Sequence, residues 1–196
     1  MENTNLGILR QPLKYIYRHP LLSEEVLDRI WEAHTPVQFK KNELLLKEGE
    51  TAAEYYLVEE GLFRAFVYDY DNNEITTEFF CVGEIVIIPS SLFQKSPSKE
   101  NLQAVTQGKL WKIEYEKFQA LFHAIEGFRE WGRVWFSFQV FNMKQRSLDM
   151  ITETASNRYL KLLKEKPQII QQAPLKQIAS YLGITDTSLS RIRRRC

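Results

Sequence analysis

The chain has 196 residues, 44% of them hydrophobic and 26% charged, with a formal net charge of +1. This composition is typical of a globular protein, and no run approaches the roughly 18 apolar residues that a membrane span requires, which excludes a membrane-spanning helix. Two cysteines, Cys81 and Cys196, exclude a disulfide framework. The N-terminus lacks a signal-peptide core, so we expect a cytoplasmic protein with one large domain or two small ones.

The charge is distributed unevenly along the chain. Residues 152–196 carry nine lysines and arginines against three acids, whereas the preceding residues carry a net negative charge. A basic C-terminal module on an acidic body fits a phosphate-backbone partner for that module alone. Solvated surface lysine is the alternative, but it does not explain why the sign changes between the two segments.

The N-terminal half changes from a helical to a β-type pattern. Residues 6–33 have a helical pattern, in which Ser23 is expected to cap a helix that His34-Thr35-Pro36 closes. Residues 37–113 then alternate short β-type runs with turns, including a hairpin at Asp71-Asn72-Asn73. This spacing predicts an all-β sandwich or roll, and the whole chain an α+β fold.

A long helix follows the β region. Gly127 is expected to act as a break, and residues 128–151 continue for about seven turns without proline. Large apolar side chains recur on this helix every three or four residues, and we expect them to form a dimer interface with a parallel copy: Phe128, Trp131, Trp135, Phe138, Phe141 and Leu148. A helix packed wholly within its own monomer is the alternative. Thr154 is expected to cap a further helix, which Pro167 stops.

The C-terminal residues 175–195 predict a helix-turn-helix. Leu175, Ile178, Ala179 and Leu182 form one buried stripe, Gly183 suits the left-handed end of the helix, and Thr185 is expected to cap the second helix. A helical hairpin whose exposed face happens to be basic is the alternative. We expect the second helix to read bases in the major groove with Thr187, Ser190, Arg191 and Arg194. Other polar residues are better placed for the DNA surface and phosphates: Lys176, Thr185, Ser188, Arg193 and Arg195.

Several strings resemble the Crp/Fnr family of bacterial transcription regulators, in particular its short Bacteroidetes-type branch. They are Glu48-Gly49-Glu50, Tyr56-Leu57-Val58 with Gly61, Gly83-Glu84, Asn157-Arg158-Tyr159-Leu160 and residues 178–184. The resemblance covers nearly the whole chain. It implies a cyclic-nucleotide-binding-like β-roll (a double-stranded jelly roll) with flanking helices at 1–126, a central dimerisation helix at 127–151 and a helix-turn-helix DNA-binding domain at 152–196.

The resemblance places a candidate effector pocket at Gly83, Glu84, Ser98 and Lys99. In cyclic-AMP binders the glutamate holds the ribose hydroxyl, and an arginine pairs with the cyclic phosphate. Here Ser98 stands in place of that arginine, so we do not expect cyclic AMP, and whether another small effector binds stays open. An open cavity behind these residues would indicate an effector, whereas one filled by Phe80, Leu92 or Phe93 would indicate a ligand-free regulator.

Other chemistries find little support in the sequence. An iron–sulfur sensor needs four cysteine ligands, and His19, His34 and His123 lie in no distinctive context for haem. We find no metal-ligand spacing and no catalytic triad, and therefore expect neither a metal nor an enzyme.

We expect a homodimeric transcription regulator that reads palindromic double-stranded DNA and acts with RNA polymerase, away from membranes. The alternative is a sensor or protein-interaction module with a vestigial helix-turn-helix.

Overall fold

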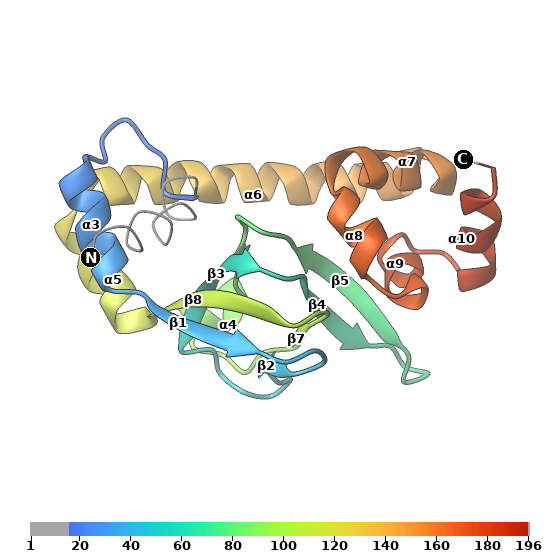
Figure 1. The fold of residues 1–196 in the computed structure, drawn as a ribbon, viewed down its shortest axis with the longest axis horizontal. Coiled ribbons are helices and arrows are strands. Elements are labelled where there is room, and N and C mark those ends of the chain that lie inside the picture. Colours follow the sequence, from blue (N-terminus) through green and yellow to red (C-terminus); the bar gives the residue numbers. More distant parts are fainter. Residues whose placement is uncertain (1–15, 196) are drawn as a thin grey trace, which may run out of the picture.

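The computed structural model describes residues 16–195, which form a β-roll beneath one long helix (Figure 1). The long helix α6 (Glu126–Thr152) runs along the molecule above the roll. Helices α3 (Glu24–Glu32) and α5 (Tyr115–Ala124) lie at its N-terminal end. The C-terminal helices lie at the other end, beside strand β5 (Glu74–Phe80). Within the described residues, no helix has the length and apolar character needed to cross a membrane.

The roll consists of two four-stranded antiparallel sheets. One sheet has the order β1-β8-β3-β6 and the other β2-β7-β4-β5, which confirms the predicted α+β fold and β-type region. Asn72 adopts a positive φ of 63° in the hairpin between β4 and β5, as expected for a residue type that tolerates left-handed backbone. The remaining strands are β1 (Thr35–Phe39), β2 (Leu44–Leu46), β3 (Glu54–Glu60), β4 (Phe63–Tyr68), β6 (Ile85–Val86), β7 (Asn101–Ala104) and β8 (Gly108–Glu114).

The helix boundaries confirm two predicted caps and the predicted stop at Pro167, and they correct one predicted break. The Ser23 side chain accepts a hydrogen bond from the Val26 amide at the start of α3. The Thr154 side chain likewise accepts one from the Asn157 amide at the start of α7 (Ala155–Glu165). Gly127, by contrast, lies inside α6, where a Cβ would lie 2.4 Å from the Leu21 carbonyl oxygen. Close packing therefore requires this glycine. As predicted, α7 ends just before Pro167, which is also the first residue of α8 (Pro167–Gln172), a position that proline suits. Pro36, in turn, lies within strand β1.

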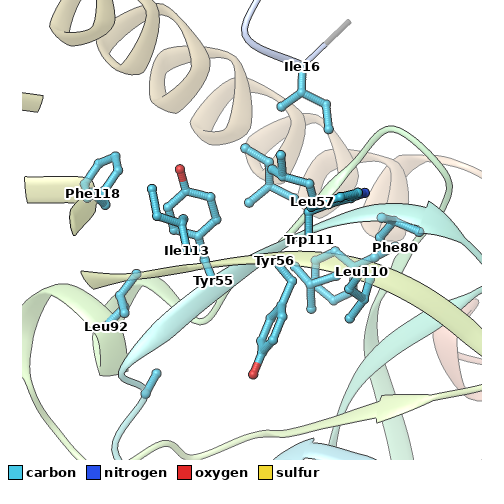
Figure 2. Close-up of a cluster of buried hydrophobic side chains, with 14 of the residues drawn as sticks. Ile16, Tyr55, Tyr56, Leu57, Phe80, Leu92, Leu110, Trp111, Ile113 and Phe118 are labelled. Atoms are coloured by element: carbon cyan, nitrogen blue, oxygen red, sulfur yellow. The ribbon is translucent and has the colours of Figure 1, made fainter. Parts of the chain in front are cut away.

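The main core fills the roll and extends under the first turns of α6. Figure 2 shows Leu57, Leu110 and Ile113 from the strands, with Phe118 from α5 close by. Phe128 and Trp131 of α6 belong to the same buried cluster. This part of α6 is therefore attached firmly to the roll.

A buried polar chain joins the N-terminal segment to the roll. The His34 Nδ1–H donates to the Ile30 carbonyl at 2.7 Å, so in the neutral ring Nε2 accepts from the Tyr17 hydroxyl at 3.1 Å. The Tyr17 oxygen lies 2.7 Å from the Tyr55 hydroxyl. Both ring nitrogens of His34 therefore have protein partners, which leaves neither one free for a haem iron. Burial lowers the pKa of His34 to about 4.

This lowered pKa makes a pH-dependent contribution to stability. Between about pH 4 and 6.5 the unfolded chain binds a proton at His34 that the folded chain does not, so stability should fall on acidification through this window. The expected slope from His34 is at most about 1.4 kcal/mol per pH unit. Urea unfolding at several pH values between 4.5 and 7 measures the free energy of unfolding, which should change less with pH in His34→Gln than in the native protein. The exposed His123→Gln control should keep the native slope, and equal slopes for native protein and His34→Gln would contradict the assignment.

Candidate DNA-binding surface

Helices α9 (Leu175–Tyr181) and α10 (Asp186–Arg193) form the predicted helix-turn-helix. Gly183 adopts a φ of +67° at the turn, and a Cβ there would meet Met150 of α6 at 2.6 Å. Both the backbone conformation and the close packing therefore favour glycine. Thr185 caps α10, because its hydroxyl accepts a hydrogen bond from the Ser188 amide at 3.3 Å.

The inner faces of the two helices form a second apolar core. Ile178, Ala179 and Leu182 of α9 are buried, as is Leu189 of α10. They pack with Tyr159, Leu162 and Ile169 of the preceding helices. The buried stripe predicted from the sequence is thus confirmed, and it fixes which side of α10 faces outward.

The outward face of α10 carries the predicted base-reading residues. Thr187, Arg191 and Arg194 are exposed, whereas Ser190 is partly buried. The residues expected at the DNA surface and phosphates are placed as follows: Lys176, Arg193 and Arg195 are exposed, and Ser188 is partly buried. The Thr185 hydroxyl caps the helix and lies 3.1 Å from the Thr187 hydroxyl, so a bound phosphate would have to compete for it.

Not every basic residue of the C-terminal module is free. Arg158 donates to the Leu182 carbonyl at the end of α9, Lys161 pairs with Asp149 at 2.5 Å, and Lys166 pairs with Glu84. Within residues 16–195, no carboxylate lies within ion-pair distance of Arg191 or Arg194. The available positive charge is therefore concentrated around α10.

Two of the four residues of the predicted effector pocket, Glu84 and Ser98, have protein partners for their polar groups. The Glu84 carboxylate accepts from the Cys81 amide at 2.8 Å and pairs with Lys166. Ser98 is buried, and its hydroxyl donates to the Glu100 carbonyl. Lys99 is exposed, and Gly83 is an exposed turn residue with a φ of +85°.

A small apolar cavity lies between the roll and α6. Its volume is about 10 Å³, roughly the space for a single water molecule. Aromatic side chains fill most of the surrounding space, Phe93 among them. The remaining lining residues are Tyr55, Ile85, Ile87, Phe118, Trp131, Gly132, Trp135 and Phe136. None of the four predicted effector-pocket residues lines this cavity.

The long helix presents only part of its predicted interface stripe to solvent. Phe128 and Trp131 are 0% and 6% exposed, because the N-terminal segment and α5 cover them. These two residues belong to the monomer core, which corrects their predicted place in a dimer interface. Trp135 is partly buried against the same core. Phe138, Phe141 and Leu148 are exposed, together with Val134.

Comparisons with known proteins agree with this architecture. Residues 36–124 match the cyclic nucleotide-binding domain model, whereas no curated protein matches the chain. Among solved structures, FixK2 from Bradyrhizobium japonicum is 16% identical, with 83% of each chain covered and a TM-score of 0.74. The c-di-GMP responsive regulator CLP from Xanthomonas campestris is 18% identical, with 88% of this chain and 91% of that chain covered and a TM-score of 0.68.

The catabolite activator protein of Thermus thermophilus is 19% identical, with 94% of this chain and 86% of that chain covered and a TM-score of 0.59. These three structures share the fold of roll, long helix and C-terminal helices over most of the chain. The chain therefore contains a cyclic nucleotide-binding domain at residues 36–124 and has the fold of these three structures, with a C-terminal helix-turn-helix.

Proposed function

We propose that the protein is a dimeric transcription regulator that binds double-stranded DNA through α10. The observation that carries this proposal is the exposed face of Thr187, Arg191 and Arg194 on the second helix of a helix-turn-helix. Arginine can bind guanine bidentately in the major groove, and a threonine hydroxyl can contact bases or phosphates. The regulators FixK2, CLP and catabolite activator protein share this fold, which supports the same class of activity.

The proposed dimer forms along α6. From Val134 onward, four large apolar residues are exposed on one side of the helix, and their spacing of four, three and seven residues fits a coiled-coil seam: Val134, Phe138, Phe141 and Leu148. Gln145 continues the same repeat between the last two. A second copy of α6 would cover this stripe and place the two α10 helices symmetrically for the half-sites of a palindrome.

We further propose that this regulator does not bind cyclic AMP. Ser98 offers no positive charge for a cyclic phosphate, and Glu84 already has two protein partners. RNA polymerase and a cytoplasmic location follow from the proposed role in transcription, and we propose no catalytic activity.

Arg191 and Arg195 should affect DNA binding differently. Arg191→Ala should weaken binding to the preferred site by about 1–3 kcal/mol and leave binding to random DNA nearly unchanged, because a base contact is lost. Arg195→Ala should weaken binding to both DNAs because a phosphate contact is lost. The slope of the logarithm of the binding constant against the logarithm of the salt concentration should fall in magnitude by about 1. Gel shifts across a salt series measure both effects. Equal losses on both DNAs for Arg191→Ala would contradict its base-reading role.

The dimer seam can be tested with two exposed residues on opposite sides of α6. Phe141 and Met143 are 62% and 69% exposed, but only Phe141 lies on the proposed seam. Phe141→Glu would place two carboxylates face to face, and should raise the dimer dissociation constant by at least about 100-fold. Met143→Glu is the matched control and should leave the dimer intact. Sedimentation equilibrium measures both, and the reverse pattern would show that the seam is misplaced.

A further inference from the structure

Strand β5 is the last strand of its sheet, so one side of its backbone has no strand partner. Such edges normally expose free N–H and C=O groups. Here α9 lies along that edge (Figure 1). The Thr76 amide donates to the Ser180 hydroxyl at 3.1 Å, and the Phe79 and Tyr181 rings lie 5.2 Å apart. The DNA-binding module thus covers the free edge of the roll.

Arg146 joins three elements at this edge. Its guanidinium donates to the Thr77 carbonyl of β5 and, at 3.2 Å, to the Tyr181 carbonyl of α9. The same guanidinium lies 4.0 Å from the centre of the Tyr181 ring, a cation–π distance. One side chain of α6 therefore holds both the roll and the helix-turn-helix.

Glu84 and Lys166 form the second polar link. The Lys166 ammonium lies 2.7 Å from one Glu84 carboxylate oxygen and 2.9 Å from the other. The Cys81 amide, which donates to the same carboxylate, fixes its direction. Lys166 lies between α7 and α8, so this ion pair attaches the start of the DNA-binding module to the turn that precedes β6.

Apolar packing surrounds these polar contacts. Leu62, Phe79 and Val105 of the roll share one buried cluster with the core of the helix-turn-helix. Gln168 adds a hydrogen bond to the Gly61 carbonyl at 3.0 Å. Domains within a chain move relative to one another unless their interface is large and apolar. The combination of an apolar cluster and polar links therefore fixes the orientation of the module.

In this docked arrangement the reading face of α10 stays free. Thr187, Arg191 and Arg194 are exposed, whereas the contacts with the roll come from α8, α9 and Lys166. Docking therefore presents the reading face instead of covering it. A binding surface held in its bound orientation loses less entropy when the complex forms.

We propose that Glu84, Lys166 and Arg146 form an interdomain clamp that holds the helix-turn-helix on strand β5 in a DNA-competent orientation. In this clamp Glu84 positions the helix-turn-helix and does not contact a ligand. Its contribution to DNA binding rests on the proposed function, whereas the docking itself can be measured without DNA.

Hydrogen exchange at the Thr76 amide reports docking, because its acceptor belongs to α9. In Glu84→Lys or Lys166→Glu two like charges face each other, and exchange at Thr76 should accelerate about tenfold, or about 1.4 kcal/mol. The double variant Glu84→Lys/Lys166→Glu should restore slow exchange. The milder variant Glu84→Gln keeps an acceptor for the Cys81 amide and should accelerate Thr76 exchange less. It serves as the test if a charge reversal prevents folding.

Two controls separate the clamp from general destabilisation. The Ala104 amide, which donates to the Glu43 carbonyl within the roll, should exchange at the native rate in every variant. Lys164→Glu reverses an exposed charge two residues from Lys166 and should leave Thr76 exchange unchanged. Native exchange rates at Thr76 in both single charge reversals and in Glu84→Gln would overturn the clamp.

DNA binding provides the second readout. Affinity for the preferred site should fall about tenfold in each single charge reversal, and the double variant should regain most of it. Faster Thr76 exchange with unchanged affinity would overturn the DNA-competent orientation while leaving DNA binding itself established. If native protein bound no DNA, the proposed function would fail, yet the exchange result would still decide the docking.

Discussion

The contact between the free edge of β5 and helix α9 connects the two halves of this protein. An uncovered edge strand is prone to pair with other chains, and here the helix-turn-helix covers it. The Ser180 hydroxyl accepts a hydrogen bond from the Thr76 amide, and Arg146 of α6 donates one to the Thr77 carbonyl. The apolar cluster beneath includes Phe79 from the strand and Ile178 from α9. Because α10 packs on α9, its orientation relative to the roll is linked to this contact between α9 and β5.

The core beneath the long helix is built largely from aromatic side chains. Phe93, Trp131 and Trp135 line a small apolar cavity, and the first turns of α6 are buried in the same core. The carboxylate of Glu84 lies at the interdomain contact with Lys166. Glu84, which the sequence places in an effector site, thus contacts the C-terminal helices.

Local sequence patterns predicted much of this structure, because they encode local interactions. The β-type runs, the caps at Ser23, Thr154 and Thr185, and the glycine at the helix-turn-helix corner depend on residues close in the chain. The outward face of α10 followed from helical periodicity in the same way.

Contacts between distant residues could not be predicted in this way. A single apolar repeat on α6 contains both Phe128, which is buried in the monomer, and Phe141, which is exposed. Only the three-dimensional position of α5 and the N-terminal segment distinguishes them. Likewise, nothing near Lys166 in the sequence indicates its partner Glu84, which lies 82 residues earlier.

The central claim is that this chain, as a dimer, reads a symmetric DNA site without a nucleotide effector. The most direct measurement is selection of binding sites from random double-stranded DNA by the purified protein, with and without added cyclic AMP. We predict the same enriched palindrome under both conditions, with half-sites about one helical turn apart. Enrichment of no symmetric sequence, or of one only when cyclic AMP is present, would contradict this account.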